Sequence, residues 1–486
     1  MKISRWLKRI SKWSLALLVV LISLYALAYA WISWSAKREW AQTKKELEGR
    51  GEKLSLADFI PPLIPDEDNM FNAPLFHGLR NEKGKSKYRV EELAGAEMTL
   101  AARSSGSQAI PNLAKFSQHW RKSENKNQSD AEIALKVFGE HPIFWEELFQ
   151  ATKKTQARFP VRYEQTYVAL LPHIPEITLL CRLLYLRALA FMETGKPANA
   201  EQDILRIFQL SDTLEKEPLL ISQFVRMSDV SLAFSGIYEG IQRHVWTPQQ
   251  LKSFEDRLAY EKFIESGLLA LRGERGTINE CLMQLLSNKW EAGKFLSNIE
   301  AVQNDGSQDE YTQWWSIIIP WDWAYYSMAF CSLQIQRTID VFMHAGERGI
   351  NRQNSPFPSI NLNRVGYFKK IKYLFVGIFL PAIEDASKKF VKTQTQNDLA
   401  RIACVLERYW IANGVYPEKL ETLVPQYIQK LPQDVAIAAP YHYRLNARDN
   451  FTLWSVGFDG VDDGGVPITK ANLEKGDRVW GAFETK

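Results

Sequence analysis

Residues 13–34 read WSLALLVVLISLYALAYAWISW and contain no charged side chain. As an α-helix this run would span about 33 Å, which is enough to cross the hydrocarbon core of a bilayer. Trp13 lies at one end and Tyr29, Trp31 and Trp34 lie at the other, and aromatic rings of this kind favour the membrane–water interface. The run therefore predicts a single transmembrane helix, and a membrane is the first partner that we expect for this chain.

A cleaved signal peptide is the alternative, because Ala28-Tyr29-Ala30 has the small-x-small form of a cleavage site. We favour the anchor, since the apolar run is longer than the core of a signal peptide. Basic residues flank the run on both sides, within residues 2–12 and again within residues 37–50. A short basic tail before a single span favours a cytoplasmic tail at residues 1–12. We therefore expect the bulk of the chain outside the cytoplasm.

Composition excludes several classes of protein. The chain has 486 residues, of which 46% are hydrophobic and 24% charged, and its net charge is +4. So small a net charge does not indicate nucleic acid as a partner. The four cysteines lie far apart without a CxxC pair, so neither a zinc knuckle nor a disulfide-dense scaffold is indicated.

The chain after the anchor is expected to be mainly α. Residues 37–51 are polar and favour a helix, and Pro61, Pro62 and Pro65 break any helix after them. Residues 35–130 are therefore predicted to form a tether that is rich in loops. From residue 131 to 365 we expect an irregular helical domain. Residues 183–191 and 200–210 carry apolar side chains at helical spacing on either side of a Gly-containing turn, which predicts a helical hairpin. No second copy follows at a 34-residue period, so a solenoid is not indicated.

An aromatic segment, residues 311–330, stands out within this domain. After Tyr311, which opens the segment, it contains Trp314, Trp315, Trp321, Trp323, Tyr325 and Tyr326. Such clusters can line a glycan groove or rest on a membrane surface, but they more often form the packed centre of a helical domain. We favour packing.

No catalytic constellation can be read from the sequence. The seven histidines are scattered without an HExxH motif, and no GxSxG, P-loop or GxGxxG occurs. Glu261 and Glu265 share a helix face, but the neighbouring Lys262 indicates a solvated surface. We therefore expect that the protein is not an enzyme.

The last 120 residues have a different sequence pattern from the helical domain before them. A helix continuing from Ile383 carries an apolar stripe of four residues, Leu399, Ile402, Leu406 and Tyr409. It is predicted to end at Asn413-Gly414, where glycine favours a left-handed cap. Residues 441–445 and 451–456 then predict a β-hairpin whose connection is residues 446–450. We expect these elements to fold as an independent α+β module at residues 366–486.

Four short motifs occur in this module in a definite order. They are Asn413-Gly414-Val415-Tyr416-Pro417, Tyr427-Ile428-Gln429-Lys430-Leu431-Pro432-Gln433-Asp434, Tyr441-His442-Tyr443 and Val456-Gly457-Phe458-Asp459-Gly460. This order resembles the C-terminal domain of the major pseudopilin of type II secretion systems. Because residues 366–370 lack the family's processing glutamate, the resemblance does not extend to processing and polymerisation. It implies a long helix packed on a small antiparallel sheet, in a single-pass protein of the bacterial inner membrane whose partners are envelope or secretion proteins.

The resemblance also implies calcium as a cofactor. In that family the aspartate of the last motif and the carbonyl three residues before it are ligands, and here they are Asp459 and Val456. Asp462, Asp463 and Asp477 offer further carboxylate oxygens, which calcium prefers. The alternative is a solvated Asp-Gly turn without a metal.

Together these features predict a membrane-anchored, extracytoplasmic structural or interaction protein with a pseudopilin-like C-terminal domain. The alternative is an envelope enzyme or a glycan-binding protein that uses the aromatic helical segment. Burial of those aromatic rings would favour the first prediction, and a groove lined by them would favour the second.

Overall fold

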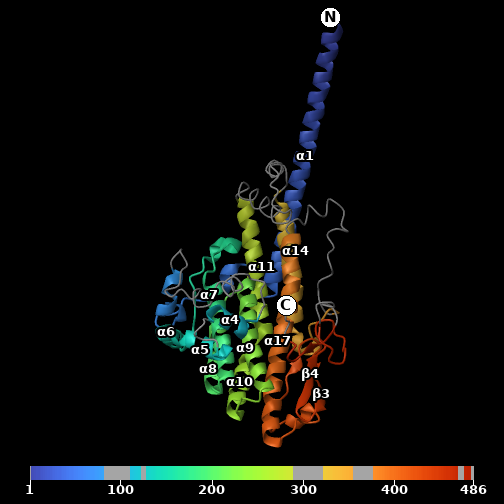
Figure 1. Ribbon diagram of the computed structural model, residues 1–486. Coiled ribbons are helices and arrows are strands. Elements are labelled where there is room, and N and C mark those ends of the chain that lie inside the picture. Colours follow the sequence, from blue (N-terminus) through green and yellow to red (C-terminus); the bar gives the residue numbers. More distant parts are fainter. Residues whose placement is uncertain are drawn as a thin grey trace. The chain divides into compact units, whose positions relative to one another are not determined.

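The computed structural model describes residues 2–80, 110–121, 127–287, 321–353, 376–468 and 476–482, and these are mostly helical, as predicted (Figure 1). The α-helices are α1 (Lys2–Gly49), α4 (Leu113–Trp120), α5 (Asp130–Gly139), α6 (Pro142–Thr152), α7 (His173–Glu193), α8 (Pro197–Asp212), α9 (Leu220–Gln242), α10 (Pro248–Tyr260), α11 (Phe263–Ser287), α14 (Trp323–Met343), α15 (Ala345–Arg348) and α17 (Val376–Asn413). Short 3-10 turns connect them: η1 (Leu56–Phe59), η2 (Met70–Asn72), η3 (Pro74–Arg80), η5 (Tyr163–Val168) and η7 (Leu420–Leu423).

Helix α1 contains the predicted apolar run. Its most apolar window has a mean hydropathy of 2.4, and none of that window is buried inside the protein. Among the described residues it is the one helix that is long and apolar enough to cross a membrane. The helix continues without a break to Gly49, so the polar, helix-favouring residues at the start of the tether are helical.

The chain divides into two compact units, and each contains segments that are distant in sequence. The first unit comprises residues 1–58, 275–336 and 359–383, and the second comprises residues 59–274, 337–358 and 384–486.

In the first unit, the segment after α1 is fastened to α11 by buried polar groups. The Arg275 guanidinium, which is fully buried, donates to the Glu52 carboxylate at 2.6 Å and to the Lys53 carbonyl at 2.7 Å. The Glu280 carboxylate accepts hydrogen bonds from the Ser55 hydroxyl at 2.7 Å and from the Leu56 amide at 2.9 Å. Because a buried charge is costly unless it is paired, these bonds hold the segment against α11.

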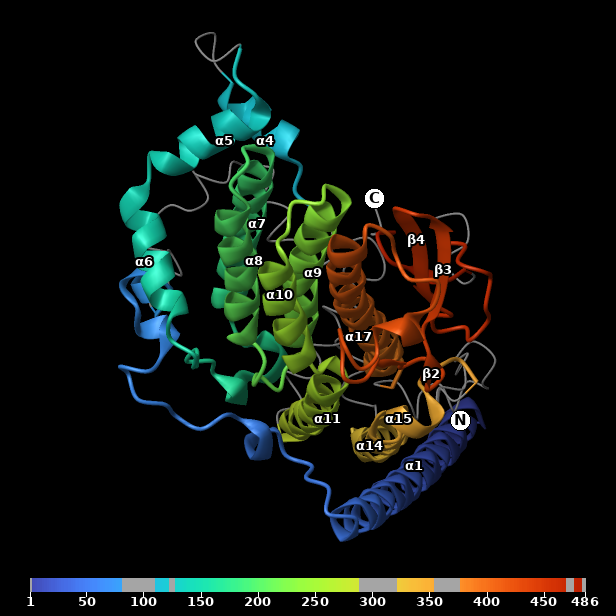
Figure 2. The ribbon, with the colours of Figure 1, turned by 90° about the horizontal axis from the view of Figure 1, so that it is seen from below.

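The second unit begins with stacked helices. The predicted helical hairpin is confirmed as α7 and α8, joined at Gly195, whose φ of 71° is the left-handed conformation that glycine favours. Helix α9 packs against both of them, and Figure 2 shows α7, α8, α9 and α10 side by side. Buried charges between the helices are paired, as in the bidentate contact of Arg187 with Asp203.

The predicted β-hairpin is also confirmed. The strands are β1 (Gln433–Asp434), β2 (Ala439–Pro440), β3 (His442–Ala447), β4 (Asn450–Ser455) and β5 (Arg478–Val479). Strands β3, β4 and β5 form an antiparallel sheet in that order, and β1 pairs with β2. The connection between β3 and β4 is tighter than predicted, because a register shift after Leu445 lets Ala447 pair with Asn450 across a turn at residues 448–449.

Helix α17 is covered on both sides, which the apolar stripe alone did not indicate. Leu399, Ile402 and Leu406 are buried as predicted, and Tyr409, the fourth residue of the stripe, is half-buried. Every residue from 402 to 407 is buried as well. Toward the sheet, the Tyr441 hydroxyl donates to the Asp398 carboxylate at 3.0 Å. On the other side, the Asn397 amide donates to the Leu258 carbonyl of α10 at 3.1 Å. The C-terminal elements therefore share their central helix with the helical body, which argues against an independent module.

One surface prediction needs correction. Glu261 is almost fully buried at the end of α10 and accepts hydrogen bonds from Arg226 and Arg257, both at 2.6 Å. Glu265, by contrast, is exposed and lies 3.2 Å from Lys262, as a solvated surface would place it. The difference arises because Arg226 reaches Glu261 from α9, a distant part of the chain, while Arg257 lies one turn before it on α10.

Candidate functional site

The candidate calcium residues lie on and beside the loop that follows β4. Cross-strand pairing places His442 opposite Trp454 and Arg444 opposite Thr452, and the loop packs over these side chains. Asp462 pins the loop to the sheet, because its Oδ1 accepts hydrogen bonds from Trp454 Nε1 at 3.0 Å and from the Gly464 amide at 2.9 Å.

Asp477, immediately before β5, also holds this loop. Its Oδ1 accepts from the Asp463 amide at 3.2 Å, and its Oδ2 accepts from the Gly465 amide at 2.6 Å. The residue as a whole is 1% exposed. Gly465 has a φ of 82°, so the loop reaches this carboxylate in a conformation that favours glycine.

The electrostatics of the two carboxylates differ. Burial raises the pKa of Asp477, and the nearby charges of Asp462 and Asp463 raise it further, while its two amide donors lower it. The pKa of Asp462 is lowered, chiefly by the hydrogen bond from Trp454. The carboxylates of Asp462 and Asp463 therefore place negative charge near Asp477, and a bound cation would offset this charge.

The structure thus brings Asp462, Asp463 and Asp477 together. Asp459 lies a turn earlier, where its Oδ1 accepts from the Val461 amide at 3.2 Å in a local turn. Val456 is buried at the end of β4. The first pair of implied ligands, Asp459 and Val456, therefore belongs to the turn, and the other three belong to the anchored loop.

The arrangement as it stands does not form a metal cage. Within the described part of the chain, no group of three or more His, Cys, Asp or Glu side chains is placed to hold a metal ion. Several of the aspartate oxygens point at backbone amides, which compete with a cation for the same lone pairs. Calcium needs six to eight oxygens, so binding here requires the loop to exchange amide donors for the ion.

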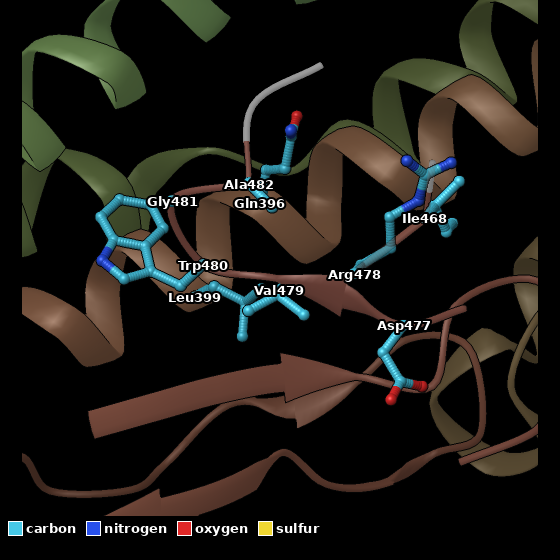
Figure 3. Close-up of a pocket in the computed structure, with 9 residues that line it drawn as sticks. All are labelled: Gln396, Leu399, Ile468, Asp477, Arg478, Val479, Trp480, Gly481 and Ala482. Atoms are coloured by element: carbon cyan, nitrogen blue, oxygen red, sulfur yellow. The ribbon is translucent and has the colours of Figure 1, made fainter. Parts of the chain in front are cut away.

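A small pocket lies beside β5, between that strand and α17 (Figure 3). Its lining residues are Gln396, Leu399, Ile468, Asp477, Arg478, Val479, Trp480, Gly481 and Ala482. Figure 3 shows the Asp477 carboxylate pointing away from Gln396, toward the loop that it anchors. Asp477 therefore borders the pocket and also holds the aspartate-containing loop.

Two residues that sequence reasoning did not single out contribute to this region. His442 Nδ1 lies 3.5 Å from Asp462 Oδ2, and strand alternation opposite Trp454 could have indicated that position. Asp434 is fully buried and accepts a hydrogen bond from the Ala436 amide at 2.9 Å, and burial raises its pKa. Its position in the second of the four motifs was the feature of the sequence that could have indicated this residue.

The aromatic helical segment is packed where the structure describes it. Trp321 and Tyr326 are buried, and Trp323 and Tyr325 are half-buried. Trp314, Trp315 and residues 366–370 lie outside the described residues. The described rings therefore favour packing over a glycan groove.

No protein-family model, no curated protein and no solved structure matches the chain. The resemblance to the pseudopilin C-terminal domain accordingly rests on the four motifs quoted above.

Proposed function

We propose that this chain is a membrane-anchored structural or interaction protein of the bacterial envelope, held by α1 with its bulk outside the cytoplasm. The observation that carries the proposal is the apolar window of α1, whose side chains are not covered by any part of the protein. An uncovered apolar helix of this length is typical of a membrane span or of a signal sequence that is removed.

Two features favour an uncleaved anchor over a signal peptide. The helix passes through Ala28-Tyr29-Ala30 without a break and continues to Gly49. After Ala30, both Ala36 and Leu47 are fully buried in the first unit, and Lys37 lies 3.8 Å from Asp322. The segment after the span is thus built into the protein.

Membrane fractionation tests the anchor. We expect the full chain to sediment with membranes and to resist carbonate extraction, because α1 spans the bilayer. External protease added to spheroplasts should degrade the chain beyond residue 36. Recovery of a soluble form that begins near Trp31 would refute the anchor, and protection from protease with membrane retention would reverse the proposed orientation.

We further propose a pseudopilin-like role for the C-terminal elements, as an accessory of an envelope or secretion assembly. The order of elements supports it: a long helix, a cap at Gly414 with a φ of 72°, and a three-stranded antiparallel sheet. Affinity purification of the full chain from detergent-solubilised membranes tests it. Recovery of no envelope or secretion component would count against this role.

Calcium binding by the loop is the second part of this proposal, and the charge gathered around Asp477 supports it. We expect millimolar calcium to raise the Tm of the full chain, because a ligand that binds only the folded state stabilises it. Asp459→Ala should abolish the increase, whereas Asp256→Ala, on the exposed face of α10, should not. An unchanged Tm across the calcium titration would mean that the loop is an Asp-Gly turn that binds no metal.

A further inference from the structure

A proline-rich segment lies at the surface near the start of the second unit. It reads Ile60-Pro61-Pro62-Leu63-Ile64-Pro65, and the three acidic residues Asp66, Glu67 and Asp68 follow it directly. Residues 60–65 form neither helix nor strand. Their conformation is set instead by the prolines.

The prolines restrict this backbone to an extended, left-handed course. The proline ring fixes φ at about −65°, which applies to residues 61, 62 and 65. A residue that precedes a proline is pushed into the β and polyproline II region, and here this applies to Ile60, Pro61 and Ile64. The sequence of the segment therefore favours a polyproline II helix before any partner binds.

The exposure of the side chains follows the three-residue period of that helix. Pro61 and Ile64 are half-buried, whereas Pro62 and Pro65 are exposed. Leu63 is 84% exposed. A polyproline II helix has three residues per turn, so residues three apart share one ridge. One ridge is therefore partly covered by the protein, and the ridge of Pro62 and Pro65 faces the solvent together with Leu63.

The C-terminal end of the segment is held in place. The Pro65 carbonyl accepts hydrogen bonds from the amides of Asp68 and Asn69, both at 3.1 Å, which closes a turn. The buried Asn69 side chain donates to the Arg158 carbonyl at 2.9 Å and accepts from the Arg158 amide at 3.0 Å. A segment fixed in this way loses little conformational entropy when a partner binds it.

We propose that residues 60–68 are a docking segment for a protein whose binding groove is lined by aromatic rings and bordered by basic side chains. Aromatic-lined grooves bind polyproline II segments through prolines spaced three apart, as Pro62 and Pro65 are. The basic border follows from residues 66–68, whose three carboxylates are exposed directly after the second proline. The same carboxylates disfavour an anionic lipid surface, which an exposed apolar segment could otherwise contact.

Photo-cross-linking of the full chain in the cells that produce it tests the docking segment. A benzophenone-bearing amino acid is placed at position 63, where it labels the molecule that lies against the exposed side of the segment. We expect a cross-linked protein whose labelled peptide, identified by mass spectrometry, contains Trp or Tyr with Lys or Arg close to it. Recovery of lipid adducts alone, or of no adduct, would overturn the proposal.

Matched proline variants show whether the partner recognises the polyproline II ridge. Pro62→Ala combined with Pro65→Ala frees the backbone and removes both rings of the ridge, so the yield of the cross-link should fall by about tenfold. Pro160→Ala combined with Pro248→Ala removes two exposed prolines outside the segment and should leave the yield unchanged. Equal yields from the two pairs would overturn the proposal.

The acidic end of the segment is tested separately. Glu67→Gln combined with Asp68→Asn should lower the yield, because the basic border of the groove loses its partners. An unchanged yield would refute that border. The inference rests on the interaction role proposed above but not on the membrane anchor. Failure of the cross-link would leave the carbonate extraction of α1 unaffected, so the two proposals can fail independently.

Discussion

Replacing Asp229 with asparagine should remove a large part of the pH dependence of stability. Asp229 lies within α9, where it is 1% exposed, and its Oδ2 accepts a hydrogen bond from the Thr178 hydroxyl at 3.3 Å. Burial raises the pKa of Asp229 to about 8, and the opposing effects of Thr178 and Arg182 are smaller. The carboxyl group is therefore neutral in the folded protein at pH 6 and ionised in the unfolded chain.

The sign and size of the effect follow from this difference in bound protons. The unfolded chain binds one proton fewer than the folded protein, so the free energy of unfolding falls by about 1.4 kcal/mol per pH unit from this group. The contribution is complete below the unfolded pKa of 3.8 and is lost as the pH rises through about 8. Over that interval the loss approaches about 6 kcal/mol.

Urea unfolding of the full chain in detergent at pH 5, 6, 7 and 8 measures this slope. Asp229→Asn should make the slope less negative by about 1.4 kcal/mol per pH unit, because asparagine has no proton to release. Asp256→Asn is the matched control, since that aspartate is on α10 and its side chain is 64% exposed. Equal slopes in wild type and Asp229→Asn would refute the reasoning.

Two further predictions test the packing. A fragment of residues 384–486 should show no cooperative thermal unfolding by circular dichroism, because α17 loses its partners on one side, such as Leu258 and Glu255. A sharp unfolding transition in the isolated fragment would contradict this prediction. Gly240→Ala should lower stability by about 1–3 kcal/mol, because its Cβ would lie 2.0 Å from the Trp246 ring. Gly139→Ala, with nothing within 4 Å of its Cβ, is the control in α5, and equal melting temperatures for the two variants would count against this contact.

The sequence could indicate those features that depend on residues close together in the chain. The apolar run of α1, the α7–α8 hairpin and the β3–β4 hairpin each follow from local periodicity and turn residues. The buried stripe of Leu399, Ile402 and Leu406 could be predicted for the same reason.

Features that depend on distant partners could not be predicted in this way. Asn397, Asp398 and Glu407 are polar and would be assigned to a solvated face, but each is buried because its partner arrives from elsewhere in the chain. In the candidate site, the glycine- and aspartate-rich loop was recognisable, but its anchoring by Asp477 was not. That contact depends on where β5 returns to the sheet, which one sequence does not specify.

The unbroken course of α1 has a mechanical consequence. From Trp34 to Gly49 the helix rises about 22 Å, and the segment after it is held by Arg275 and Glu280. A helix fastened at its end transmits tilt and rotation, whereas a flexible linker would absorb them. If α1 spans a membrane, as proposed, the first unit would be carried at a set height above the bilayer and would turn with this helix. A partner in the envelope would have to present its binding surface at that same height above the bilayer.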